Sequence, residues 1–113
     1  MFRRATLALA LLSATISLPA LAQSCDTSFN VVNNSGRTIM EIYFSPARQN
    51  NWGADRLGAD VLAAGASKAF RPSPGGAYDF RMVFDGGAPV ERRNVDICAV
   101  STITVTATGI NAQ

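Results

Sequence analysis

Apolar and polar residues alternate with a period of two along most of the chain after residue 22, and turn-forming residues interrupt the alternation at short intervals. The clearest run is 78–84, where Tyr, Phe, Met and Phe take every second position. Successive side chains of a β-strand point to opposite faces, so this pattern is typical of strands with one buried face. We expect about six or seven strands in an all-β fold, either a small antiparallel β-sandwich or a small barrel.

Turn signals predict how these strands connect. Asn33-Asn34-Ser35-Gly36 separates strands expected at 28–32 and 38–45, and Asn and Gly tolerate the positive φ of a tight turn. We therefore expect these two strands to form a hairpin. In the second of them, the alternation places Met40, Ile42 and Phe44 on one face and Ile39, Glu41 and Tyr43 on the other.

The second half of the chain continues the pattern after a loop at 47–58 and a short helical turn expected near 59–63. Asp85-Gly86-Gly87 predicts a hairpin between the run at 78–84 and the segment that follows it. The Thr-rich segment 101–108 closes the domain, with Ile and Val inward, and we expect it to form an exposed sheet edge.

Residues 1–22 have the three-part pattern of a secretory signal peptide. Arg3 and Arg4 precede an apolar run, Pro19 ends it, and small residues follow at the cleavage positions. The run is too short to anchor the chain in a bilayer. We expect cleavage before Gln23, no membrane insertion afterwards, and a single periplasmic or secreted domain over 23–113.

The two cysteines, Cys25 and Cys98, lie near opposite ends of the mature chain. In an exported protein this spacing predicts a disulfide. The bridge would close most of the domain into one loop, which stabilises the fold by roughly 4 kcal/mol in the chain-entropy description. The alternative is a lipidated Cys25, which would leave Cys98 unpaired.

Composition excludes several classes of function. Without Arg3 and Arg4 the chain carries eight basic and eight acidic residues, so no basic surface argues for nucleic-acid binding. The chain has no histidine, which removes the commonest general base and metal ligand. We therefore expect no enzymatic activity, no cofactor and no metal.

The remaining polar side chains leave alternatives open. Asp55 and Asp60 share the central loop and suit a calcium-dependent binder or a carboxylate-based enzyme. Arg92 and Arg93, with Arg81 on the paired strand, suit either an anion site or cross-strand ion pairs with neighbouring carboxylates.

Trp52, between Asn51 and Gly53 in the same loop, has two interpretations. A loop tryptophan can stack a ligand such as a sugar or anchor a partner. Alternatively it folds back to cap an open end of the sandwich, because a small domain needs its largest apolar side chain in the core.

Short motifs follow one another along nearly the whole mature chain. They are Phe29-x-Val31-x-Asn33-x-x-Gly36, Tyr43-x-Ser45-Pro46, Trp52-Gly53, Gly65-x-Ser67, Tyr78-Asp79-Phe80-Arg81 and Asn94-Val95-Asp96-Ile97-Cys98. In this order they resemble a family of short exported bacterial proteins with a signal sequence, one compact β domain and no established activity. The resemblance implies a periplasmic or secreted β domain and carries over no catalytic residues.

Together these features predict a non-enzymatic extracytoplasmic binding or interaction module. We expect a monomer that recognises a protein or small-molecule partner, with Trp52, Asp55 and Asp60 in the candidate binding loop. The alternative is a structural or accessory subunit of an envelope assembly that joins its neighbours through the exposed edge at 101–108.

Overall fold

Seven β-strands and no helix make up residues 25–113, the part of the chain described by the structure, which is a computed structural model. The predicted signal peptide lies outside the described residues. The strands are β1 (Phe29–Asn33), β2 (Ile39–Pro46), β3 (Ser67–Phe70), β4 (Ala77–Phe84), β5 (Val90–Asp96), β6 (Thr102–Val105) and β7 (Ile110–Ala112).

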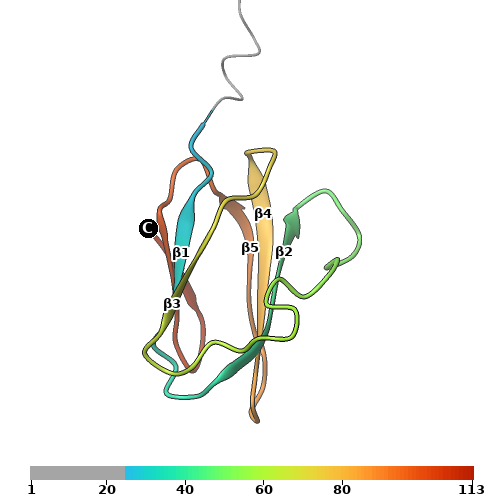
Figure 1. Ribbon diagram of the computed structural model, residues 1–113. Coiled ribbons are helices and arrows are strands. Elements are labelled where there is room, and N and C mark those ends of the chain that lie inside the picture. The colour runs from blue at the N-terminus through green and yellow to red at the C-terminus, as the bar shows by residue number, and fades with distance from the viewer. Residues whose placement is uncertain (1–24) are drawn as a thin grey trace, which may run out of the picture.

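The strands form two sheets, one of four strands in the order β3-β1-β6-β7 and one of three in the order β2-β4-β5 (Figure 1). Neither sheet closes on itself, so the fold is the predicted β-sandwich and not a barrel. Every pairing is antiparallel except that of β1 with β6, which is parallel.

The predicted hairpin of β1 with β2 is wrong, because the two strands belong to different sheets. The segment after β1 instead carries the chain across the sandwich. Asn33 is fully buried, and its side-chain amide donates hydrogen bonds to the carbonyls of Arg37 (2.8 Å) and Leu62 (2.9 Å). Its carbonyl oxygen accepts from the Ser35 backbone amide at 3.1 Å. These bonds satisfy the buried amide and hold the crossing in place.

The predicted alternation of β2 is interrupted at one position. The register with β4 shifts between Ile39 and Glu41, so Met40 has no paired residue and is 38% exposed. A bulge inserts one extra residue and reverses the facing of the side chains beyond it. Ile39 therefore lies in the core together with Ile42 and Phe44, which a strict alternation does not allow.

The β4–β5 hairpin is confirmed, with Gly86 and Gly87 of its turn in the left-handed region at φ +84° and +80°. The expectation of a terminal edge strand is wrong. The segment 101–108 ends as a strand at Val105, and β6 lies between β1 and β7 in the interior of its sheet. The edge position belongs to the short β7.

The core lies between the two sheets and contains an aromatic cluster. The ring of Phe29 in β1 lies 5.2 Å from that of Phe44 in β2 and 5.5 Å from that of Phe80 in β4, centroid to centroid. Both contacts are edge-to-face, the arrangement that aromatic quadrupoles favour. Phe70 of β3 adds a third contact across the sandwich, 5.2 Å from Phe44.

The long loop between β2 and β3 covers the free edge of β2. It has no helical turn near 59–63, so that expectation is wrong; Leu62 there forms a bridge with Ile39 instead. Leu57 and Leu62 are each 5% exposed and belong to the core cluster. These two leucines supply the core contacts of this loop, the role proposed for a capping Trp52.

A disulfide joins Cys25 and Cys98, whose Cα atoms are 5.5 Å apart, as predicted. No free thiol remains among residues 25–113. The bond uses the Sγ atom that a lipid anchor on Cys25 would need. Within the same residues, no helix is long and apolar enough to cross a membrane.

Candidate functional site

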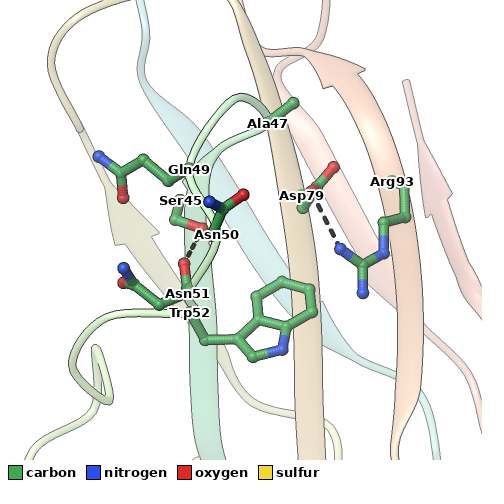
Figure 2. Close-up of a pocket in the computed structure, with 8 residues that line it drawn as sticks. All are labelled: Ser45, Ala47, Gln49, Asn50, Asn51, Trp52, Asp79 and Arg93. Carbon is green, nitrogen blue, oxygen red and sulfur yellow. Dashed lines mark hydrogen bonds and ion pairs between the residues drawn. The ribbon is translucent and has the colours of Figure 1, made fainter.

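A pocket of about 380 Å³ opens on the three-stranded sheet where β2 ends and the long loop begins (Figure 2). Its volume falls in the range of small-molecule sites. Most of its lining is polar, with one aromatic side chain. The lining residues are Ser45, Ala47, Gln49, Asn50, Asn51, Trp52, Asp79 and Arg93.

Backbone turns after β2 build one wall of the pocket. The Gln49 amide donates to the Pro46 carbonyl at 2.9 Å, which closes a turn. The Ser45 hydroxyl then donates to the Asn51 carbonyl at 3.1 Å and draws the loop back over the strand. Trp52 follows directly, so these contacts hold its backbone beside the end of β2.

Trp52 is half-buried and lies outside the hydrophobic core cluster. The Arg93 guanidinium carbon lies 4.7 Å from the centroid of the indole, close enough for a cation–π contact. Figure 2 shows the indole broadside, with Arg93 approaching it from β5. The structure therefore places Trp52 in the wall of a surface pocket.

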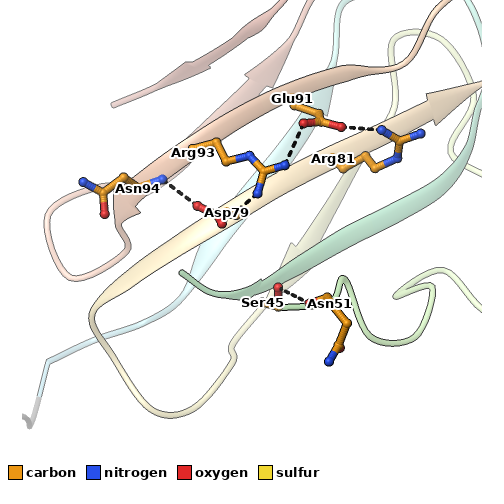
Figure 3. A network of polar contacts seen from close by, with 7 residues as sticks. All are labelled: Ser45, Asn51, Asp79, Arg81, Glu91, Arg93 and Asn94. Atoms are coloured by element: carbon orange, nitrogen blue, oxygen red, sulfur yellow. Dashed lines mark hydrogen bonds and ion pairs between the residues drawn. The ribbon is translucent and has the colours of Figure 1, made fainter. Parts of the chain in front are cut away.

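Asp79 anchors the opposite wall. It faces Ser45 in the register of β2 with β4, and it is only 7% exposed. One carboxylate oxygen accepts from the Asn94 backbone amide at 2.8 Å, and the other accepts from Arg93 Nη1 at 3.1 Å (Figure 3). Charge-assisted bonds of this kind are stronger than bonds between neutral groups.

A bulge in β5 makes room for these bonds. The β4–β5 register shifts between Tyr78 and Phe80, so Asp79 faces both Arg93 and Asn94. Asn94 has φ +62°, a left-handed conformation that Asn adopts more readily than most residues. The bulge directs the Asn94 amide toward Asp79 and Arg93 toward the pocket.

Arg93 and Arg81 form cross-strand ion pairs with Asp79 and Glu91, as one of the two sequence interpretations predicted. Arg93 Nη2 donates to Glu91 at 3.1 Å, and Glu91 also pairs with Arg81. Arg92 is not part of this network; its Nη1 donates to the Ile110 carbonyl at 3.1 Å. With Asp79, the network holds two positive and two negative charges, so the pocket is close to neutral.

The groups with shifted pKa values lie outside the pocket lining. A hydrogen bond donated to Glu41 raises the pKa of the Tyr43 hydroxyl, and burial raises that of Tyr78. A hydrogen bond with Ser28 lowers the pKa of Asp26. These residues therefore do not determine the charge of the site.

Asp55 and Asp60 do not line the pocket. The Asp55 oxygen Oδ1 accepts from the backbone amides of Ile42 (3.0 Å) and Leu57 (2.9 Å), so this carboxylate fastens the loop to the edge of β2. Asp60 is exposed on the loop. Across residues 25–113 no group of three or more His, Cys, Asp or Glu side chains is placed to hold a metal ion.

Sequence reasoning identified Trp52 but missed Asp79 as a pocket residue. Asp79 lies at an outward position of an alternating strand, where a solvated carboxylate is the ordinary expectation. Asn94 is the residue in the sequence that could have indicated the bulge opposite Asp79, because asparagine tolerates the positive φ that such a bulge requires. Comparison of the chain with protein-family models, with curated proteins and with solved structures finds no match.

Proposed function

We propose that this protein is a non-enzymatic extracytoplasmic module that binds a small polar ligand in the Trp52 pocket. Residues 1–22 would direct export, and the mature protein would begin at Gln23 in the periplasm or outside the cell. The Cys25–Cys98 disulfide supports this location, because such bonds persist in oxidising compartments.

The observation that carries the proposal is the position of Trp52. A large aromatic side chain in a small domain normally contributes to the core. Here the core is completed by Leu57 and Leu62, while Trp52 lines a concave polar surface beside Asp79 and Arg93. A pocket that combines an aromatic group with a few convergent polar groups is the usual form of a small-molecule site.

The polar groups of the pocket suit binding better than catalysis. A glycosidase needs two carboxyl groups flanking the bond it cleaves, and the pocket lining includes only Asp79. Both oxygens of Asp79 accept hydrogen bonds within the fold. The chain also lacks the histidine that most general-base mechanisms use.

Trp52 is the only tryptophan, so its fluorescence reports on the pocket alone. The mature protein, with its disulfide intact, is titrated with saccharides, amino acids, dicarboxylates and short peptides. We expect a saturable change in Trp52 emission with at least one class. Calorimetry should show that the same ligand loses at least about tenfold in affinity for Trp52→Ala, or about 1.4 kcal/mol.

Val61→Ser is the matched control, since Val61 is an exposed apolar residue of the same loop outside the pocket. It should bind with unchanged affinity. Absence of a response from every class would refute the proposal. A response that Trp52→Ala retains would also refute it, because the ligand would then bind elsewhere.

A further inference from the structure

We infer that the ligand of the Trp52 pocket is an uncharged saccharide, with one sugar ring stacked on the indole and its hydroxyl groups bonded to the side-chain amides of the pocket. The inference rests on the proposed function and adds the chemical class of the ligand. It follows from the charge of the pocket, its free hydrogen-bonding groups and the support beneath Trp52.

The charges of the pocket are already paired. Arg93 donates to Asp79 and to Glu91, each at 3.1 Å, and Glu91 is shared with Arg81. An anionic ligand at Arg93 would meet two carboxylates, and a cationic ligand at Asp79 would meet the Arg93 guanidinium. Like charges at short range disfavour binding, so the network favours a ligand without net charge.

The hydrogen-bonding groups of the pocket match hydroxyl groups. No described residue takes a hydrogen bond from the side-chain amides of Gln49, Asn50 or Asn51. Figure 2 shows the Asn50 amide directed toward Asp79, while the other two amides point away from it. An amide offers both donors and an acceptor, and a sugar hydroxyl is likewise both donor and acceptor.

Arg93 supports the indole as a stacking surface. Its guanidinium can cover only one face of Trp52, and among residues 25–113 no other cation or aromatic ring stacks on that side chain. Because Asp79 and Glu91 fix Arg93, the indole is held before a ligand arrives. Such preorganisation lowers the entropic cost of binding.

A pyranose ring matches that surface. One face of the ring presents C–H groups with small positive charges, and the face of an aromatic π-system is negative. Its hydroxyl groups project from the ring edge and can bond to the side-chain amide of Asn50 in the polar lining of the same pocket. A purely apolar ligand would leave these polar groups desolvated and unpaired, which is unfavourable.

The test uses ligands that share a ring and differ in charge. The mature protein is titrated with glucose, glucuronate and glucosamine, with the matching galactose series, and with neutral oligomers of glucose, mannose and N-acetylglucosamine. We expect a neutral member to bind, and each charged counterpart of a bound sugar to bind at least about fivefold more weakly, a difference of about 1 kcal/mol.

Two amide variants locate the contact. Asn50→Ala should weaken the bound saccharide by about threefold to tenfold, as expected for one lost hydrogen bond. Asn34→Ala, an exposed amide outside the pocket, should leave the affinity unchanged. Circular dichroism and a thermal melt establish that both variants are folded.

The outcomes separate this inference from the function on which it rests. Tighter binding of an amino acid, a peptide or a uronate through Trp52 would refute the saccharide and leave the binding module standing. A neutral sugar whose affinity is insensitive to Trp52→Ala would refute the stacking geometry. No binding from any class would overturn both.

Discussion

Trp52 contributes little to the stability of the fold, because it is half-buried and lies outside the core. We predict that Trp52→Ala lowers the free energy of unfolding by about 1 kcal/mol, the scale of an exposed cation–π contact and a partial burial. Phe44→Ala, in the aromatic core, should lower it by about 3–5 kcal/mol. Urea denaturation of both variants tests the contrast, and an equal loss would show that Trp52 is a core residue.

Asp79 differs from Trp52 in its burial and bonding, since it is buried and both of its carboxylate oxygens accept hydrogen bonds. We predict that Asp79→Ala lowers the free energy of unfolding by about 2–3 kcal/mol, because it leaves the Asn94 amide unpaired. Asp85→Ala, in the exposed hairpin turn, should change it by less than about 0.5 kcal/mol. Chemical denaturation measures both, and similar values would exclude a structural role for Asp79.

The buried side-chain amide of Asn33 holds the segment that connects the two sheets through its hydrogen bonds to Arg37 and Leu62. We predict that Asn33→Asp lowers the free energy of unfolding by about 2–4 kcal/mol, because a carboxylate would face the carbonyls of Arg37 and Leu62 without a donor. The neighbouring Asn34→Asp, at an exposed position, is the control and should be close to neutral. A thermal melt in which both variants behave alike would contradict this account.

At the scale of elements, the loop between β2 and β3 protects a sheet edge. Asp55 accepts from the Ile42 amide, and Arg56 donates through its backbone to the Ile42 carbonyl at 2.7 Å and through Nη2 to the Phe44 carbonyl at 2.7 Å. These contacts occupy groups that an incoming strand would need. The free edge of β2 is therefore not open to pairing with another chain.

The turn before β4 packs directly on the disulfide. A Cβ atom added at Gly75 would lie 2.7 Å from both sulfur atoms, whereas one at Gly109 would meet nothing within 4 Å. We predict that Gly75→Ala lowers the melting temperature, because overpacking reduces the free energy of unfolding by about 1–3 kcal/mol. Gly109→Ala should leave the melting temperature unchanged. The loss should shrink in the Cys25→Ala, Cys98→Ala double variant, where the clash is removed. An undiminished loss would place the strain elsewhere.

Alternation predicted where strands occur, and β4 buries the four apolar side chains of the run at 78–84. It did not predict which strands pair. The Asn33 turn has the composition of a hairpin turn, but the path of the chain after β1 depends on a hydrogen bond from Asn33 to Leu62, which lies far along the chain. The bulges at Met40 and Asn94 were also missed, because one inserted residue has no periodic signature. The pocket depends on the second bulge, so only its tryptophan was identified.

For the whole molecule, the disulfide supplies stability that a domain of this size otherwise lacks. It joins residues 73 positions apart. We predict that replacing both cysteines by Ser lowers the free energy of unfolding by about 2–5 kcal/mol, measured by urea denaturation. The native protein should resist alkylation without reductant. Two alkylated thiols in the folded protein would contradict the bond.

Because β1 pairs with β6, a strand that is synthesised early cannot complete its pairing until a strand near the end of the chain has been synthesised. Cys25 has no partner sulfur until Cys98 is synthesised, and until residues 102–105 follow, β1 has only β3 beside it in its sheet. Non-local pairings of this kind slow folding. The four-stranded sheet can therefore be completed only after the last strands of the chain have been synthesised.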